Sequence, residues 1–168
     1  MKKILVAAGL TTLMMGTTAM AELQIGVSVA RFDDNGLTVM RNGMTAYDDA
    51  SDEVSLQMED ATDDVAKQLD QINNFIASGV DAIIVNAVDT NATEAMSNAA
   101  AAAGVPLVYV NRQPINMATL PEGQAFVASN EIESGTLAAF QMCRQLRAEC
   151  KAGGARAYVL VGQLSNQA

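Results

Sequence analysis

The chain has 168 residues, half of them hydrophobic, and its formal net charge is −9 at pH 7. This length suits one domain, or one domain with a piece of a second, and the composition allows a substantial hydrophobic core. Binding of nucleic acid requires clustered Lys and Arg that neutralise phosphates, and the sequence has no such cluster. The sequence therefore predicts a folded, acidic protein with no nucleic-acid partner.

Residues 1–21 have the features of a cleaved export signal. Lys2 and Lys3 give a positive start, residues 4–15 are apolar or small, and Ala19-Met20-Ala21 matches an A-x-A cleavage site. The alternative is an N-terminal membrane anchor, but this apolar stretch is too short to cross a bilayer easily. We therefore expect export, with Glu22 as the first residue of the mature chain.

Strands and helices are expected to alternate along the mature chain. Apolar runs predict strands at 23–29, 53–58, the run between Gly79 and Asn86, 105–110, 125–128 and 157–161. Helical spacing predicts a helix capped by Asn35, one capped by Thr62 or Asp63 and ended by Gly79, one from Asn91 to Ala103, and one over about 134–149. This alternation predicts right-handed crossovers and an α/β fold, a doubly wound parallel sheet with helices on both faces.

Polar residues follow the first, third and fourth predicted strands where each strand ends. In open α/β sheets, ligands bind outside the carboxyl ends of the strands. Asp accepts hydrogen bonds, Arg donates several from a planar fork, and Asn does both, which suits a ligand rich in hydroxyl groups. An aromatic ring can cover the apolar side of a sugar. The candidate ligand-binding residues are Phe32, Asp33, Asp34, Asn86, Asn111 and Arg112.

Several of these residues also have a purely structural interpretation. Asp34 or Asn35 can cap a helix, and Asp89 or Thr90 can cap a later one. Asn86 can fix the loop beside it, and Arg112 can be a surface charge.

Motifs for catalysis, cofactors and metals are missing from the sequence. It contains no His, which removes the commonest general base and zinc ligand. It contains no G-x-G-x-x-G after the first strand, no phosphate-binding P-loop and no G-x-S-x-G elbow. On one helix, Cys143 and Cys150 would lie roughly 10 Å apart, beyond the disulfide limit of about 7 Å. We expect no enzyme, cofactor or metal site, and two unpaired thiols unless the helix ends before Cys150.

Four stretches together resemble the periplasmic sugar-binding proteins that serve ABC importers, a class that includes the ribose-, galactose- and inositol-binding proteins. They read I-G-V-S-x-A-R-F-D-D-N, G-V-D-A-I-I-V-N-A-V-D-T, V-P-L-V-Y-V-N-R-Q and A-S-N-E-x-x-S-G. The inositol or rhizopine branch is nearest, through A-R-F-D-D-N and N-R-Q-P. The resemblance implies the type I periplasmic binding protein fold, in which two lobes close on one sugar.

The resemblance also implies roles for single residues. Asn86 and Arg112 would bind sugar hydroxyls, and Asp34 or Asp33 would bind from the first loop. Asn111 stands where relatives often carry Asp. Many relatives place aromatic residues where this chain has Gly36 and Leu37, which leaves ring stacking to Phe32.

The resemblance implies a signal peptide at 1–21, an incomplete first lobe at 22–128, and a hinge crossing with the start of a second lobe at 129–168. Family members run on for well over a hundred further residues, so we expect a truncated protein with half a binding cleft. The implied partners are a monosaccharide or cyclitol, an ABC permease in the inner membrane and a chemoreceptor, for a periplasmic protein that is monomeric at full length. The rivals are an exported α/β enzyme acting on a sugar or small acid, and the sensing lobe of a receptor or repressor.

Overall fold

The computed structural model describes residues 22–160, so the predicted export signal at 1–21 lies outside the described residues. Five parallel strands form one sheet in the order β2-β1-β3-β4-β5. They are β1 (Leu23–Val29), β2 (Val54–Asp60), β3 (Ala82–Asn86), β4 (Leu107–Val110) and β5 (Gln124–Val127). The helices are α1 (Asn35–Asp48), α2 (Val65–Ser78), α3 (Thr93–Ala103) and α4 (Glu131–Ala148), with short 3-10 turns η1 (Thr90–Ala92) and η2 (Met117–Thr119).

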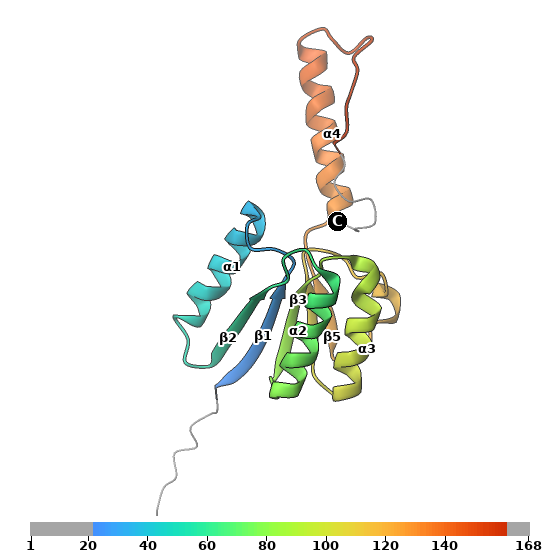
Figure 1. Cartoon of the computed structure of the whole chain (residues 1–168). Coiled ribbons are helices and arrows are strands. Elements are labelled where there is room, and N and C mark those ends of the chain that lie inside the picture. Colours follow the sequence, from blue (N-terminus) through green and yellow to red (C-terminus); the bar gives the residue numbers. More distant parts are fainter. Residues whose placement is uncertain (1–21, 161–168) are drawn as a thin grey trace, which may run out of the picture.

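Helices α2 and α3 cover one face of the sheet, and α1 covers the β1–β2 part of the other face, as Figure 1 shows. This arrangement confirms the predicted doubly wound parallel α/β fold. The crossovers from β2 to β3 and from β3 to β4 run in one direction, and the crossover from β1 to β2 runs in the other. Because such connections are right-handed, the direction of each crossover decides which face its helix covers.

The larger core lies between the sheet and the pair α2 and α3. Ile72 and Phe75 of α2 pack there against Ile83 and Tyr109, and none of these side chains is more than 1% exposed. Gly26 of β1 allows α2 to come this close, because a Cβ atom at that position would lie 2.5 Å from a ring carbon of Phe75. The glycine thus sets the distance between α2 and the sheet.

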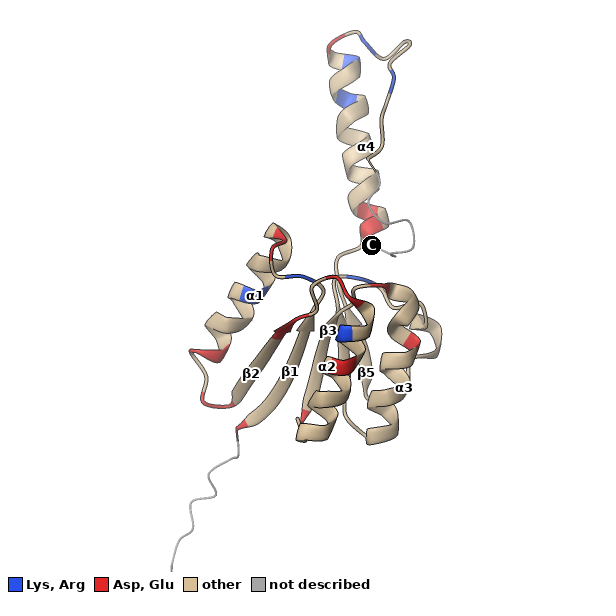
Figure 2. Ribbon diagram, in the orientation of Figure 1, with Lys and Arg blue, Asp and Glu red and all other residues tan. Residues whose placement is uncertain are grey.

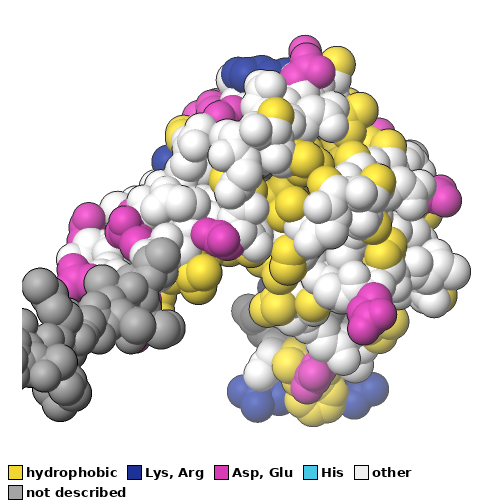
Figure 3. Space-filling model, turned by 90° about the horizontal axis from the view of Figure 1, so that it is seen from below, with side chains coloured by type: hydrophobic (Ala, Val, Ile, Leu, Met, Phe, Trp, Pro, Cys, Tyr) yellow, Lys and Arg dark blue, Asp and Glu magenta, His cyan; other side chains and the backbone are white. Residues whose placement is uncertain are grey.

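The opposite face of β4 and β5 is open among the described residues. Val108 pairs with Ala125, and Val110 pairs with Val127, whose side chain is 62% exposed. Parallel sheets are normally covered on both faces, so this is an unusual exposure of apolar surface. Figure 3, which looks from the amino ends of the strands, shows hydrophobic side chains exposed among acidic ones.

Helix α4 extends away from the sheet, beyond the carboxyl ends of the strands (Figure 1). Asn130 caps it, and its acidic residues lie near the sheet while Arg147 lies in its last turn (Figure 2). This order of charges complements the helix dipole. Among residues 22–160, no helix combines the length and apolar character that a membrane span requires.

Some predicted boundaries are wrong. Asp34 caps α1 instead of Asn35, and Asp64 caps α2 instead of Thr62 or Asp63, which both have positive φ. Helix α3 begins at Thr93, two residues after the predicted start at Asn91, which lies inside η1; Asp89 caps η1, in agreement with one of the two predicted caps. Each error is a shift of one or two residues. At α1 and α2 it arises because an Asp side chain next to the predicted cap reaches the free N–H groups at the helix start.

In the carboxyl-terminal part of the chain, the structure differs more from the predicted elements. Helix α4 begins three residues before the predicted start at 134, and residues 157–160 form no strand. A parallel strand needs a neighbour for its hydrogen bonds, and nothing in the described chain offers one there. The helix does end before Cys150, yet Cys143 and Cys150 are both exposed free thiols. Gly79 ends α2 as predicted, and Gly104 follows the predicted last residue of α3, Ala103, with φ of 79° and 69°.

Candidate functional site

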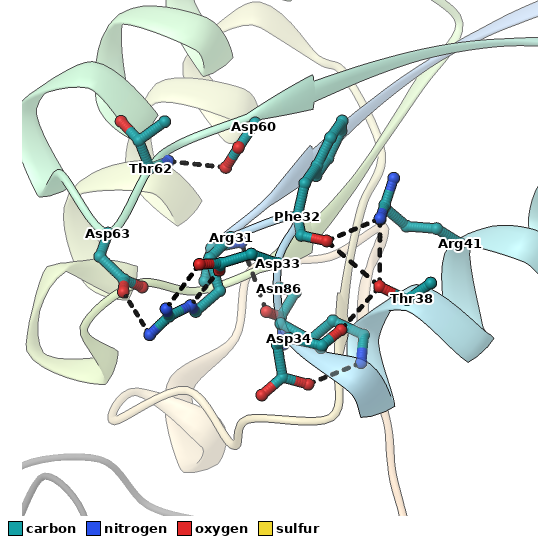
Figure 4. Close-up of polar contacts among 12 residues, drawn as sticks. Arg31, Phe32, Asp33, Asp34, Thr38, Arg41, Asp60, Thr62, Asp63 and Asn86 are labelled. Carbon is teal, nitrogen blue, oxygen red and sulfur yellow. Dashed lines mark hydrogen bonds and ion pairs between the residues drawn. The ribbon is translucent and has the colours of Figure 1, made fainter.

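The loop after β1 is held by two ion pairs. Arg31 Nε lies 2.6 Å from Asp33, and Arg31 Nη1 lies 3.0 Å from Asp63 in the loop before α2 (Figure 4). The hydrogen bond to Asp33 raises the pKa of the Arg31 guanidinium, and the same bond lowers the pKa of Asp33. Asp33 therefore stays ionised, but its carboxylate is engaged by Arg31.

Asp34, the next residue, caps α1 and also faces solvent. Its Oδ1 accepts a hydrogen bond of 2.9 Å from the Leu37 N–H, as the structural interpretation of this residue predicts. Its Oδ2 atom has no hydrogen-bond partner among residues 22–160. The cap therefore fixes the carboxylate in place and leaves one oxygen available to accept a hydrogen bond.

Phe32 is half-buried, and its ring packs against the smaller core between the sheet and α1. The guanidinium of Arg41 lies over the ring, 3.9 Å from its centroid, and Arg41 Nη2 donates to the Phe32 carbonyl at 2.8 Å. Figure 4 shows the ring pointing away from Asp33 and Asp34. Arg41 thus occupies a ring face that a ligand would need for stacking.

Asn86, at the end of β3, joins three strand ends. Its Oδ1 accepts from the Ala30 N–H at 3.4 Å, and its Nδ2 donates to the Val110 carbonyl at 3.3 Å and to Asn111 Oδ1 at 3.2 Å. Asn86 is fully buried, whereas Asn111 is exposed and has a left-handed φ of 67° that Asn tolerates. Asn86 therefore aligns the loops after β1 and β4, which is the structural role that the sequence left open for it.

Arg112 is half-buried beside Asn111. Its Nη1 donates to the carbonyls of Ala87 and Val88, at 2.6 and 3.0 Å. These two bonds hold the guanidinium across the end of β3, so Arg112 is more than a surface charge. Its Nε and Nη2 atoms make no hydrogen bond among the described residues. The site therefore keeps fixed, charged donors that could bind hydroxyl oxygens.

A buried network of side-chain hydrogen bonds joins α2 to β1 and β3 and supports the carboxyl edge of the sheet. The sequence analysis did not predict this network. Gln68 Nε2 donates to Ser28 Oγ at 3.1 Å and to the Asn86 carbonyl at 3.0 Å, and Gln68 Oε1 accepts from the Val88 N–H at 2.8 Å. Ser28 donates to Gln71 Oε1 at 2.7 Å. Both glutamines lie on the apolar stripe of α2, and this position was the signal that could have revealed them.

A cavity of about 530 Å³ lies at the carboxyl ends of β4 and β5, where the chain enters α4. Its polar lining comes from Asn111, Gln113, Ser129, Asn130 and Glu131. Phe126 and Ile132 form its apolar lining. This volume falls within the range of small-molecule sites, and the mixture of amide groups with an apolar wall suits a polar ring.

The structure therefore gathers the predicted residues at one edge of the sheet. Asn86, Asn111 and Arg112 lie side by side, and the loop that carries Asp33 and Asp34 is bonded to Asn86 through Ala30. Phe32 comes from the same loop, but its ring belongs to the core under α1. In the part of the chain that the structure describes, no group of three or more His, Cys, Asp or Glu side chains could hold a metal ion.

Comparison with known proteins finds related sequences over nearly the whole chain. The sequence model of the periplasmic binding protein domain matches residues 25–168. The chain is 54% identical, over all of its 168 residues, to a Rhizobium meliloti protein named "Putative rhizopine-binding protein", of which it covers 52%. It is 28% identical, over 129 residues, to the D-galactose/methyl-galactoside binding periplasmic protein of Haemophilus influenzae. That match covers 76% of this chain and 39% of the relative.

Solved structures show the same fold. An ABC transporter solute binding protein from Bacillus halodurans C-125 with bound myo-inositol gives a TM-score of 0.69 at 32% identity, over 78% of this chain and 44% of that one. A Mycobacterium smegmatis structure in complex with β-D-fucofuranose gives a TM-score of 0.73 over 86% of this chain and 46% of that one. At 21% identity, this second likeness concerns the fold alone. The chain spans about half the length of the relatives it matches.

Proposed function

This chain belongs to the periplasmic binding protein domain family, and we propose that it provides the first lobe of a binding protein for a monosaccharide or cyclitol. One observation carries the proposal: the free hydrogen-bonding atoms at the carboxyl edge of the sheet. Arg112 retains Nε and Nη2 as donors, and Asp34 retains one carboxylate oxygen as an acceptor. Both side chains are already fixed by other bonds, so little conformational entropy is lost when they bind hydroxyls.

In this proposal, residues 22–128 form the first lobe, and a hinge at the start of residues 129–168 leads to the second. The direction of α4, which leaves the sheet directly after β5, supports this division (Figure 1). The ligand would bind between the lobes and be enclosed when they rotate about the hinge. Arg112, Asp33 and Asp34 would contact it directly, while Asn86 would hold the loops that carry them.

We further propose that the full-length protein is exported to the periplasm, acts as a monomer and delivers its ligand to an ABC permease in the inner membrane. The names of the matched relatives support this role, since they include an ABC transporter solute binding protein. It would bind its ligand without transforming it. The sequence supports this last point, because it has no His, the commonest general base.

A nuclear magnetic resonance titration tests the proposal. The chain is titrated with D-ribose, D-galactose and myo-inositol, separately, at concentrations high enough to detect weak binding. We expect at least one of them to shift the backbone resonances around Asp34 and Arg112, and Arg112→Ala to reduce that response. Uniformly unchanged spectra with all the ligands would contradict the proposal. Production of a new compound from any of them would favour the rival enzyme.

A further inference from the structure

Gln68 of α2 is fully buried, and two backbone groups fix the orientation of its amide. The Val88 N–H donates to its Oε1 atom at 2.8 Å, and the Asn86 carbonyl accepts from its Nε2 atom at 3.0 Å. Because an N–H group only donates and a carbonyl only accepts, the amide cannot turn end for end without losing both bonds. Its Nε2 atom also donates to Ser28 Oγ at 3.1 Å. The side chain is therefore held at both ends of its amide.

Gln68 and Arg112 bind opposite edges of one peptide unit. The Ala87 carbonyl and the Val88 N–H belong to the same trans peptide, in which the two groups lie in one plane and point in opposite directions. Gln68 Oε1 accepts from the N–H, and Arg112 Nη1 donates to the carbonyl at 2.6 Å. Since the unit is planar, it cannot turn at one edge without turning at the other. The direction of the Arg112 guanidinium therefore depends on Gln68.

The same stretch of backbone carries the second acceptor of Arg112. The Val88 carbonyl accepts from Arg112 Nη1 at 3.0 Å. Gln68 bonds to the N–H of Val88 and to the carbonyl of Asn86, so it holds this stretch on both sides of Ala87. Gln68 is fully buried, whereas Arg112 is half-buried. The constraint thus runs from the core of the lobe to the edge where a ligand would bind.

We infer that Gln68 is a positioning residue for ligand binding, because it sets the direction in which the Arg112 guanidinium presents its Nε and Nη2 donors. The inference rests on the proposed function, in which Arg112 binds hydroxyls of the ligand. Gln68 is fully buried, so it would act on affinity without contacting the ligand. A donor that is already held in place loses less conformational entropy on binding than a free one. Loss of Gln68 should therefore weaken binding through Arg112.

Gln71 offers a matched comparison for the test. It is also buried on α2, and its amide bonds to Ser28 at 2.7 Å and to the Asp60 carbonyl at 2.9 Å. Met is unbranched like Gln but has no amide, so Gln68→Met and Gln71→Met each remove buried hydrogen bonds. We expect both variants to unfold at lower urea concentrations than the unsubstituted chain, because buried polar groups lose their partners. Only Gln68→Met removes the bond to the Val88 N–H.

Two measurements separate a positioning role from a general loss of stability. The Nε–H resonance of Arg112, recorded without ligand, should move in Gln68→Met toward the resonance of the exposed Arg144, and should stay in place in Gln71→Met. In a titration with myo-inositol, Gln68→Met should bind about tenfold more weakly than the unsubstituted chain, in line with a weakened bond to a charged donor. Gln71→Met should bind within about twofold of the unsubstituted chain.

Gln68→Glu is the rescue variant, because burial favours its neutral form, which keeps an acceptor for the Val88 N–H. It should restore the Arg112 resonance and the affinity, and it decides the inference if Gln68→Met does not fold. Equal effects of Gln68→Met and Gln71→Met would overturn the inference, as would a displaced Arg112 resonance in Gln68→Glu. If the unsubstituted chain binds no ligand, the proposed function fails, and the ligand-free resonance alone decides whether Gln68 positions Arg112.

Discussion

Asn86 and Asn111 are joined by a hydrogen bond of 3.2 Å between the Nδ2 atom of the first and the Oδ1 atom of the second. One residue is fully buried and the other is exposed. The bond therefore connects the interior of the sheet to the surface where a ligand would bind. It makes the position of the surface amide depend on the packing beneath it, so changes in the core at this point should alter the site.

Asn86→Ala should destabilise the fold. The change leaves the buried Ala30 N–H without its acceptor, and an unsatisfied buried group costs about 1–3 kcal/mol. It also removes the bonds of Asn86 to Asn111 and to the Val110 carbonyl, although that carbonyl still accepts from the Arg112 N–H. We expect the free energy of unfolding, measured with urea, to fall by about 2–4 kcal/mol. Asn98→Ala removes the same atoms from an exposed position on α3 and should change the free energy of unfolding by less than about 0.5 kcal/mol. Similar losses in the two variants would contradict the role given to Asn86.

Gly26→Ala should force α2 away from the sheet. The added Cβ atom would lie 2.5 Å from the Phe75 ring, and such overpacking costs about 1–3 kcal/mol. Replacing Phe75 by Leu should recover part of that loss, because the smaller side chain leaves room for the methyl group. A double-mutant cycle of unfolding free energies measures the coupling. Strictly additive effects would show that the contact does not set the distance.

Gln68→Leu should loosen the loop after β3. Gln68 Oε1 accepts from the Val88 N–H at 2.8 Å, and Leu offers no acceptor in its place. We expect hydrogen exchange at the Val88 amide to become at least tenfold faster, relative to the change at the amides of β3, because the lost bond protects this group locally. Lys67→Leu, on the exposed side of α2, serves as the control. Unchanged protection of Val88 would rule out this bond as the support of the loop.

Tyr109 should make stability depend on alkaline pH. Burial raises the pKa of Tyr109 to about 12 from its ordinary value of 10.0, and its hydroxyl donates to the Thr93 carbonyl at 2.7 Å. The folded state therefore keeps a proton that the unfolded state loses, so stability falls as pH rises from about 10 toward about 12. Urea unfolding across this pH range measures the free energy of unfolding, and comparison with Tyr109→Phe isolates the contribution of the Tyr109 hydroxyl. An identical pH dependence in the two proteins would contradict it.

The sequence predicted the parallel fold and the edge of the candidate site, because both depend on local signals. Ile and Val runs mark β3 and β4, Gly79 marks the end of α2, and the polar residues Asn86 and Arg112 follow directly after strands. These signals fix where each strand ends. In a parallel sheet, that is enough to bring the residues together.

The parts that sequence reasoning could not predict depend on contacts between distant segments. The position of Gln68 and Gln71 on the apolar stripe of α2 indicates that they are buried, but helical spacing does not identify their hydrogen-bond partners on β1 and β3. The predicted strand at 157–161 failed over its described part because pairing requires a neighbour. The contact of the Arg41 guanidinium with the Phe32 ring likewise depends on how α1 crosses the loop after β1.

A crystal structure of this chain grown with myo-inositol tests the central claim most directly. We expect electron density for the ring at the carboxyl edge of the sheet, with hydroxyl oxygens within hydrogen-bonding distance of the Arg112 guanidinium and the Asp34 carboxylate. Density for the ligand at the amino ends of the strands, or on the open face of β4 and β5, would contradict it.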